Sequence, residues 1–247
     1  MPWRKTRDPY KILVSEIMLQ QTQVKRVIEF YAAFTKRFPT VQKLARAPLS
    51  EVLKVWQGLG YNRRAKYLHE AAKAIVARHA GHVPRSHEAL VALPGIGAYT
   101  ASAVRAFAWN EPDIFIETNI RTAVIHYFFP KSEKVSDARL IPLITAALDR
   151  KRPREWYYAL MDFGSFLKKT EGNASRRSAH HTRQKPFKGS DREIRGAILK
   201  MLAEKTWTRS ALLRALPFAR ERIDAQLKAL ADERMIEVKG RRFRLPD

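Results

Sequence analysis

Two acidic residues could supply a proton and a negative charge to a chemical reaction. Glu16 is surrounded in the chain by apolar residues, namely Ile12, Leu13, Ile17 and Met18. Burial among such residues removes a carboxylate from water and raises its pKa, so that it holds a proton near neutral pH. Glu117 is a second acidic residue, and a pair of carboxyl groups can divide the roles of proton donor and negative charge between them. The alternative is that Glu16 is an ordinary glutamate on a helix surface.

The segment from Leu93 to Thr100 has the composition of a tight connection between two helices. It reads Leu-Pro-Gly-Ile-Gly-Ala-Tyr-Thr. Gly95 and Gly97 let the backbone approach a phosphate closely, and the helix that we expect to begin at Gly97 points its first N–H groups at an anion. Contacts of this kind hold a duplex in register without reading its bases. Taken alone, the segment also fits an ordinary helix-turn-helix connection.

The charge of the chain points to a polyanionic partner. The 247 residues carry a formal net charge of +23 and a pI of about 10.5. A merely basic surface, a ribosomal protein or a membrane-surface protein would share this charge.

The absence of cysteine excludes disulfides, thiolate zinc sites and iron–sulfur clusters. Because no apolar run could span a bilayer and no signal peptide precedes the core, we expect a cytoplasmic protein, nucleoid-associated if prokaryotic.

The hydrophobic pattern predicts many short helices. Apolar residues recur at helical spacing through residues 13–75, and strand-like alternation is nearly absent before Asp162. Residues 168–189 are polar and basic without periodicity, which is typical of a linker or an arm that follows DNA. We therefore predict an all-α core in residues 1–167, a basic linker or DNA-tracking arm in residues 168–189 and a separate unit in residues 190–247.

The C-terminal unit is similar to a winged helix-turn-helix. Its first helix follows Ser190, Thr208 or Ser210 can cap a second helix, and a third runs from Ala219 to Glu233. Two alternating segments then flank Lys239-Gly240-Arg241, which is typical of a β-hairpin. Such a unit binds DNA or protein, and a small structural cap is the alternative.

Three motifs together resemble the helix-hairpin-helix DNA glycosylases of the HhH-GPD family. They are MLQQTQV at residues 18–24, GLGYNRRA at residues 58–65, and the 93–100 segment followed by Glu117-Thr118-Asn119. The resemblance covers residues 2–164 and is greatest to the adenine-specific, MutY-like branch. It implies a two-lobed all-α core in which Glu16 protonates the departing base. Glu117, Tyr99 and Asn119 complete the implied catalytic set.

The resemblance also implies where the lobes and the DNA contacts lie. Residues 20–110 would form the lobe with the hairpin, and the N-terminal segment would join residues 115–169 in the other lobe. Gln21 and Tyr61 match residues that wedge into the base stack when a nucleotide flips out, although Tyr61 is equally well explained as a core aromatic. The expected DNA contacts are Gln20, Gln21, Tyr61, Arg63, Gly95, Gly97, Thr100, Lys168, Lys169, Arg176 and Arg177.

The chain departs from its relatives in three ways. They usually read Asp-Gly-Asn where this chain has Glu117-Thr118-Asn119, and since a misplacement of about 1 Å can cost roughly a hundredfold in rate, we expect a pocket adjusted to Glu. Lys168 stands in place of the first of four cluster cysteines, so the basic arm would replace the DNA contacts of the cluster loop. The winged unit replaces the domain with which relatives recognise oxidised guanine.

Tyr99 stands where bifunctional relatives carry a lysine that forms a Schiff base with the sugar. The resemblance thus implies a monofunctional glycosylase of base excision repair, acting on double-stranded DNA with adenine opposite guanine or oxidised guanine. A mismatch-specific thymine or uracil glycosylase, another damaged-base glycosylase, and a non-enzymatic damage-binding or regulatory protein are the alternatives. We expect a monomer with no membrane partner and no cofactor, apart from a monovalent cation that family members hold by hairpin carbonyls.

Overall fold

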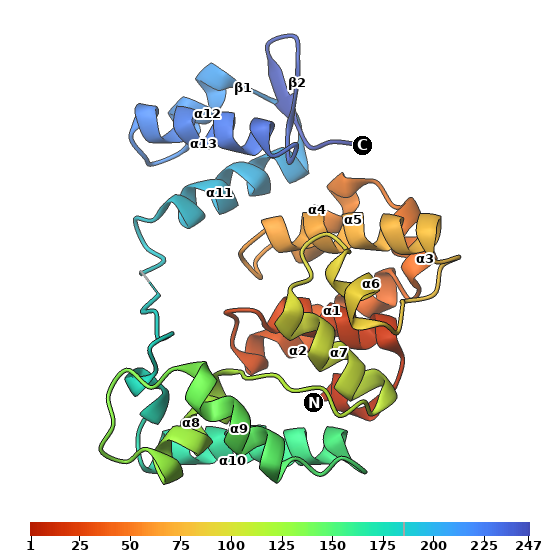
Figure 1. Ribbon diagram of the computed structural model, residues 1–247. Helices are drawn as coiled ribbons and strands as arrows, with labels where there is room; N and C mark the ends of the chain where they lie inside the picture. The colour runs from red at the N-terminus through yellow and green to blue at the C-terminus, as the bar shows by residue number, and fades with distance from the viewer. Residues whose placement is uncertain (185) are drawn as a thin grey trace.

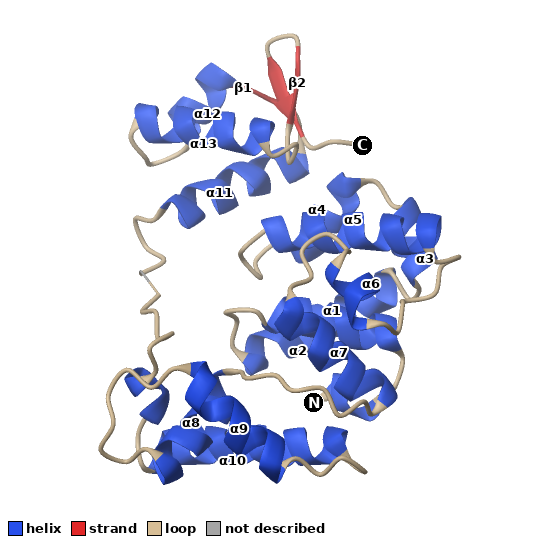
Figure 2. Ribbon diagram, in the orientation of Figure 1, coloured by secondary structure: helices blue, strands red, loops and turns tan. Residues whose placement is uncertain are grey.

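The computed structural model describes residues 1–184 and 186–247, and helices dominate those ranges (Figures 1 and 2). The elements of the first lobe are η1 (Pro2–Lys5), α1 (Pro9–Leu19), α2 (Val24–Arg37), α3 (Val41–Arg46), α4 (Leu49–Trp56), α5 (Arg63–Arg78), α6 (His87–Val91) and α7 (Ala98–Trp109). Those of the second lobe are α8 (Thr118–Phe128), α9 (Asp137–Ala147), α10 (Pro153–Thr170) and η2 (Ala174–Arg177). The C-terminal unit follows, so the predicted two-lobed helical core with a small appended unit is confirmed.

Helix α1 runs through the interior of the first lobe. Asp8 caps it, because its carboxylate accepts hydrogen bonds from the N–H groups of Tyr10 (2.9 Å) and Lys11 (3.3 Å). Pro9 occupies the first turn, where a helix leaves its N–H groups unpaired. Every residue from position 12 to position 18 is buried, and the helix packs on α2, α5 and α7. Burial on all sides fixes the position of Glu16.

The connection between α6 and α7 is the predicted hairpin. Gly95 has a φ of +74°, and a Cβ at this position would lie 2.5 Å from the Cβ of Tyr67 on α5. Glycine meets both the backbone and the steric requirement. Gly97 then caps α7 with an extended backbone, so this helix begins where the sequence predicts.

The second lobe depends on close packing between α8 and α10. A Cβ at Gly164 of α10 would lie 1.9 Å from the carbonyl oxygen of Asn119, so glycine is what lets the two helices meet. Tyr157 of α10 stacks on Phe115 with ring centroids 3.9 Å apart, and its hydroxyl donates to the carbonyl oxygen of Asp113 (2.8 Å). These contacts hold in place the segment that leads into α8 and the first turn of that helix.

The prediction that the N-terminal segment belongs to the second lobe is wrong. Trp3 of η1 lies edge-on against Tyr31 of α2 with ring centroids 5.4 Å apart, and α1 is enclosed by helices of the first lobe. Arg4 does reach across, since its guanidinium pairs with both carboxylate oxygens of Asp162 on α10 (2.6 and 2.8 Å). The physical reason is that α1 is apolar on every side and needs the interior of a lobe around it.

The C-terminal unit has the predicted three helices and hairpin. Its elements are α11 (Asp191–Glu204), β1 (Trp207–Thr208), α12 (Arg209–Ala215), α13 (Arg220–Asp232), β2 (Glu237–Lys239) and β3 (Arg242–Arg244). The hydroxyl of Thr208 accepts from the N–H of Ala211 (3.3 Å), which confirms it as a cap. The antiparallel sheet has the order β1-β3-β2, with Trp207 and Val238 flanking Phe243. Strand β1 was not predicted, because two residues show no alternation.

The predicted linker is partly structured. Helix α10 continues through residue 168 to Thr170, and η2 packs on α8. Val135 forms a bridge with Ser178, so residues up to this point belong to the second lobe. Beyond it the chain crosses to α11 (Figure 1). The division into three domains remains a prediction, and Lys185 of the predicted arm lies outside the described residues.

Among the helices that the structure describes, none has the length and apolar character that crossing a membrane would need.

Candidate active site

Glu16 is a buried acid on α1. It is 5% exposed, and the hydroxyl of Tyr99 donates a hydrogen bond to its Oε2 (3.3 Å). Burial raises the pKa of Glu16 to about 7, against the opposing effect of the Tyr99 hydrogen bond and with a further contribution from the charge of Glu117. A carboxyl with this pKa is protonated in a large fraction of molecules at neutral pH, so Glu16 can act as a proton donor there.

Tyr99 reaches Glu16 because α1 and α7 pack side by side. Its ring lies edge-on to Phe115, with centroids 5.7 Å apart. Burial, followed by the charges of Glu16 and Glu117, raises the pKa of Tyr99 well above its ordinary value. The phenol therefore stays protonated and serves as a hydrogen-bond donor to Glu16. Two residues that are 83 positions apart in the chain thus meet at this site.

Glu117 is the N-cap of α8. Its Oε1 accepts hydrogen bonds from the N–H groups of Asn119 (2.7 Å) and Ile120 (2.9 Å). Burial raises the pKa of Glu117 above its ordinary value, while the two N–H groups and the charges of Arg121 and Lys168 oppose that rise. The Glu117 side chain thus folds back onto the first turn of its own helix, and a pocket adjusted to Glu remains a prediction.

Asn119 lies in the first turn of α8, half-buried and two residues beyond Glu117. Its carbonyl group is the one against which Gly164 packs, so its backbone is held in place by α10. Within the described ranges its side-chain amide makes no hydrogen bond to protein.

Two residues that sequence reasoning missed bear on the charges of this site. The charge of Glu16 acts on Tyr158 of α10, and burial is the main cause that raises the pKa of Tyr158 to about 12. Arg121 pairs with Asp137 (2.6 Å) and its positive charge favours the ionised form of Glu117. The spacing of Arg121, four residues after an N-cap acid on the same helix face, could have revealed it. No local signal marks Tyr158.

Arg64 ties the end of α1 to the loop that precedes α5. This residue is 8% exposed, and its guanidinium donates to the carbonyl oxygens of Ile17, Met18 and Gln20 at 2.6–2.9 Å. It also donates to the carbonyl oxygen of Gly60 (3.1 Å). One buried cation thus satisfies the last carbonyls of the helix that carries Glu16. Sequence reasoning missed it, although its spacing to Leu68 places it on the buried face of α5.

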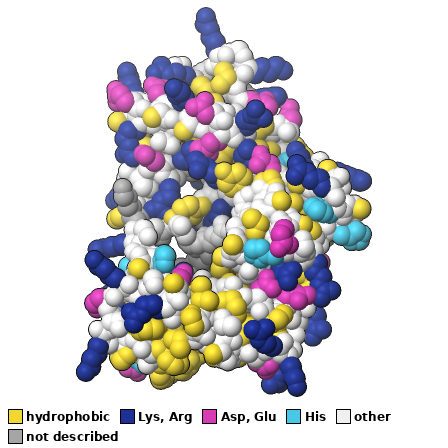
Figure 3. All heavy atoms as spheres, viewed as in Figure 1, with side chains coloured by type: hydrophobic (Ala, Val, Ile, Leu, Met, Phe, Trp, Pro, Cys, Tyr) yellow, Lys and Arg dark blue, Asp and Glu magenta, His cyan; other side chains and the backbone are white. Residues whose placement is uncertain are grey.

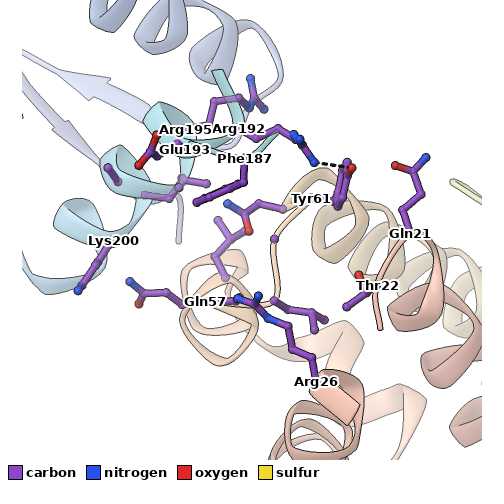
Figure 4. A pocket seen from close by; sticks show the side chains of 18 of the residues that line it. Gln21, Thr22, Arg26, Gln57, Tyr61, Phe187, Arg192, Glu193, Arg195 and Lys200 are labelled. Atoms are coloured by element: carbon purple, nitrogen blue, oxygen red, sulfur yellow. Dashed lines mark hydrogen bonds between the residues drawn. The ribbon is translucent and has the colours of Figure 1, made fainter. Parts of the chain in front are cut away.

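The two predicted wedge residues lie at neighbouring loops and have left-handed backbones. Gln21 has a φ of 53° and is exposed, and Tyr61 has a φ of 50° and is half-buried. Figure 4 shows the hydroxyl of Tyr61 bonded to Arg192 of α11 (2.6 Å), and the side chain of Gln184 donates to the same hydroxyl. Arg64 and Arg192 each lie over the Tyr61 ring, 5.2 Å from its centroid. Tyr61 is therefore a surface residue that the C-terminal unit contacts, and not a core aromatic.

A sequence profile described as "HhH-GPD superfamily base excision DNA repair protein" matches residues 14–208. The chain belongs to this superfamily. An adenine DNA glycosylase of Mycobacterium tuberculosis is 34% identical over an alignment of 271 positions, which covers 100% of this chain and 88% of that relative.

Two further similarities come from a shorter match and from a solved structure. An adenine DNA glycosylase of Buchnera aphidicola is 36% identical over 171 residues, 68% of this chain, and the chain spans 48% of that relative. The structure of a thermostable thymine-DNA glycosylase has 29% sequence identity and a TM-score of 0.59, over 67% of this chain and 77% of that one. This HhH-GPD protein therefore has similarity to enzymes named for two different bases.

Several residues that we predicted to contact DNA have partners within this HhH-GPD protein. Arg63 pairs with both oxygens of Glu233 in the C-terminal unit (2.5 and 3.2 Å). Thr100 is 2% exposed and its hydroxyl accepts from the side chain of Gln20 (3.3 Å). The Thr100 hydroxyl thus faces the interior and holds Gln20, so a DNA contact of Thr100 through its backbone remains a prediction. Arg63 joins the first lobe to the C-terminal unit through this pair, and its contact with DNA remains a prediction.

Arg177, which we also predicted to contact DNA, has partners within the protein. Its guanidinium donates to the carbonyl oxygens of Phe129 (2.6 Å) and Pro130, which anchors η2 to the end of α8. Arg176, Lys168 and Lys169 are exposed, and Figure 3 shows lysine and arginine side chains spread over both lobes and the C-terminal unit. Contacts of these three with DNA remain predictions.

The hairpin presents both of its glycines to solvent. Gly95 and Gly97 are exposed at the start of α7, as a backbone contact with phosphate requires. A monovalent cation at the hairpin carbonyls remains a prediction, since it depends on backbone oxygens and no side chain identifies it. Within the described ranges no group of three or more histidine and acidic residues is arranged to hold a metal ion.

Proposed function

We propose that this protein is a monofunctional DNA glycosylase that releases adenine from duplex DNA, opposite guanine or oxidised guanine. The observation that carries the proposal is the buried Glu16 with a pKa of about 7, held by Tyr99 next to a second carboxylate. The similarity to adenine DNA glycosylases supports adenine as the base. The net charge of +23 supports a duplex as the partner.

Protonated Glu16 donates its proton to a ring nitrogen of the flipped adenine. The electrons of the N-glycosidic bond leave with the base, and the sugar becomes cationic. Ionised Glu117 stabilises that cation, and Asn119 positions the substrate. Water then adds its oxygen to the sugar carbon and gives up a proton to a carboxylate, which leaves an abasic site in an intact strand.

The proposed reaction ends at base release because Tyr99 has no amine. A phenol cannot form the imine with the sugar that leads to strand scission. The charge of Lys168 acts on Glu117, so this lysine lies near the proposed site. The specific alternative to a monofunctional reaction is therefore an imine between the Nζ of Lys168 and the sugar. A covalent adduct trapped with borohydride would assign lyase activity to such an amine.

A thymine or uracil glycosylase is the second candidate, because a thymine-DNA glycosylase has a similar structure at 29% identity. One panel of duplexes separates the candidates, with adenine, thymine, uracil or an alkylated base placed opposite guanine or oxidised guanine. Free base and alkali-labile strands are measured together, with borohydride trapping in parallel. Adenine release without an adduct is expected. Release of thymine or uracil instead would favour the second candidate, and release of no base would favour a DNA-binding protein without activity.

A further inference from the structure

Glu16 lies in the last turn of α1, which ends at Leu19. The last four carbonyl groups of a helix have no partner within it, so the last turn frays unless other groups bind them. The usual local caps are missing here, because Gln20 stands where a glycine often follows a helix and the last turn carries no basic residue. The position of the proposed proton donor therefore depends on contacts from outside this helix.

Arg64 of α5 supplies such contacts from 44 to 47 residues away in the chain. Its guanidinium donates to the carbonyl oxygens of Ile17 and Met18 in the last turn of α1 (2.9 Å each). It also donates to the carbonyl oxygen of Gln20 (2.6 Å) and to the hydroxyl of Thr22 (3.0 Å), which follow that turn. One side chain thus holds both the end of the helix and the start of the next loop.

The guanidinium of Arg64 is itself held in one place. It lies over the rings of Trp56 (5.6 Å to the centroid) and Tyr61 (5.2 Å). Arg64 and the indole N–H of Trp56 both donate to the carbonyl oxygen of Gly60 (3.1 Å each). The planar guanidinium presents its donors on a rigid fork, so it can bind several carbonyls at once, whereas a lysine ammonium is a single point. Arg64 is therefore a fixed anchor for the end of α1.

A second set of contacts leads from Arg64 to the partner of Glu16. Gln20, whose carbonyl oxygen accepts from Arg64, donates through its side chain to the hydroxyl of Thr100 on α7 (3.3 Å). The preceding residue on α7 is Tyr99, which donates to Glu16 (3.3 Å). Both partners in the bond between Tyr99 and Glu16 are thus tied to the same anchor.

We propose that Arg64 is a positioning residue for base release, because it holds the last turn of α1 where Glu16 meets Tyr99. This inference rests on the proposed function of Glu16 as the proton donor. Arg64 acts through Glu16 and needs no contact with the substrate. Because a displacement of about 1 Å can cost roughly a hundredfold in rate, loosening this turn should slow base release strongly.

Arg64→Lys tests this inference, because it keeps the buried charge and loses the fork of donors. Adenine release is measured at saturating protein, and the titration of the Glu16 carboxyl is followed by NMR in the protein without DNA. We expect the rate to fall roughly 100-fold. Water that enters the loosened turn should also lower the pKa of Glu16 from about 7 toward the ordinary range of a glutamate. The charged and titratable groups that act on Glu16 or feel its charge are unchanged in this variant: Tyr99, Glu117 and Tyr158.

Arg154→Lys is the matched control. Arg154 is also 8% exposed, and its guanidinium donates to a backbone carbonyl, that of Ala108 (3.0 Å). This control should keep both the rate and the Glu16 titration of the wild-type protein. Arg64→Gln, which brings no charge into the interior, is measured beside Arg64→Lys and should show the same two changes.

Two results would overturn the inference. One is a lower stability of both Arg64 variants with the rate and the Glu16 titration unchanged, which would make Arg64 a structural residue. The other is an equal change of both readings in Arg154→Lys, which would show a general loosening of the interior. Failure of the proposed function is separate, because it would appear as an absence of base release by the wild-type protein, while the titration would still report the surroundings of Glu16.

Discussion

At the scale of single residues, the chemistry of the site could largely be predicted from the sequence. The apolar neighbours of Glu16 predict its burial, and the structure confirms this burial, which raises the pKa of Glu16. The bond from Tyr99 and the fold-back of Glu117 onto α8 could not be predicted, because they depend on how separate helices meet. Thr100 shows most clearly what a sequence motif cannot predict. The motif places this residue at the hairpin, but packing turns its hydroxyl toward the interior.

The two carboxyl groups predict a bell-shaped dependence of base release on pH. Glu16 must hold its proton, so the rate should fall as pH rises through about 7. Glu117 must be ionised, and because burial raises its pKa, the rate should also fall on the acid side, starting above the ordinary range of a glutamate. Single-turnover rates between pH 4 and pH 9 check both limbs. A rate that still rises above pH 8 would contradict the role of Glu16.

Tyr99→Phe gives a control for the assignment of the alkaline limb. The Tyr99 hydroxyl favours the ionised form of Glu16, so its removal should raise the pKa of Glu16 and move that limb to higher pH. The same series of rates measures the displacement. A limb that stays in place would mean that a group other than Glu16 titrates there.

At the scale of helices, local signals predicted starts and ends well and contacts between helices poorly. Gly97 begins α7 and Thr208 caps α12 as expected, since a cap is a property of a few neighbouring residues. Gly164 shows no such signal. In the sequence it is a glycine within a helical stretch, and only the structure shows that the first turn of α8 lies directly against it.

Gly164→Ala should destabilise the second lobe and displace the start of α8. The new Cβ would lie 1.9 Å from the carbonyl oxygen of Asn119, which forces the two helices apart at a cost of about 3 kcal/mol or more. Gly196→Ala is the matched control on α11, where a Cβ meets nothing within 4 Å and alanine should stabilise by up to about 1 kcal/mol. Denaturant unfolding of both variants measures the difference. Equal stabilities would show that α8 and α10 do not depend on this contact.

At the scale of the whole molecule, the placement of the C-terminal unit could not be predicted. Its helices and hairpin follow from local patterns, but docking depends on Arg63 and Glu233, which are 170 residues apart. The sequence shows that both residues are charged, but it does not show that they lie next to each other in the folded protein. The docked arrangement also explains why Tyr61 contacts Arg192 and why a cavity forms between the units.

Glu233→Gln should loosen this docking about tenfold, because it weakens the bonds to Arg63 and Arg195 while keeping the shape of the side chain. Partial burial would raise the pKa of Glu233, but the bonds from Arg63 and Arg195 outweigh it and the pKa is lowered. Docking should therefore persist at neutral pH and weaken as pH falls below the ordinary range of a glutamate. Protease cleavage between the second lobe and α11 reports the undocked fraction.

Glu237→Gln is the control for this measurement, since Glu237 pairs with Arg244 inside the C-terminal unit (2.7 Å). It should leave the cleavage rate as in the wild-type protein. Equal cleavage of all three proteins would show that the Glu233 pairs do not hold the unit in place.

The central claim is that Glu16 supplies the proton for base release, and Glu16→Gln tests it most directly. Adenine release at saturating protein and the affinity for the same duplex are measured together. The variant should lose roughly 100- to 10,000-fold in rate and bind within about fivefold of the wild-type protein, because it removes a proton donor and no phosphate contact. It should be at least as stable as the wild-type protein at pH 8, where an ionised buried Glu16 is destabilising. An unchanged rate of adenine release would contradict the claim.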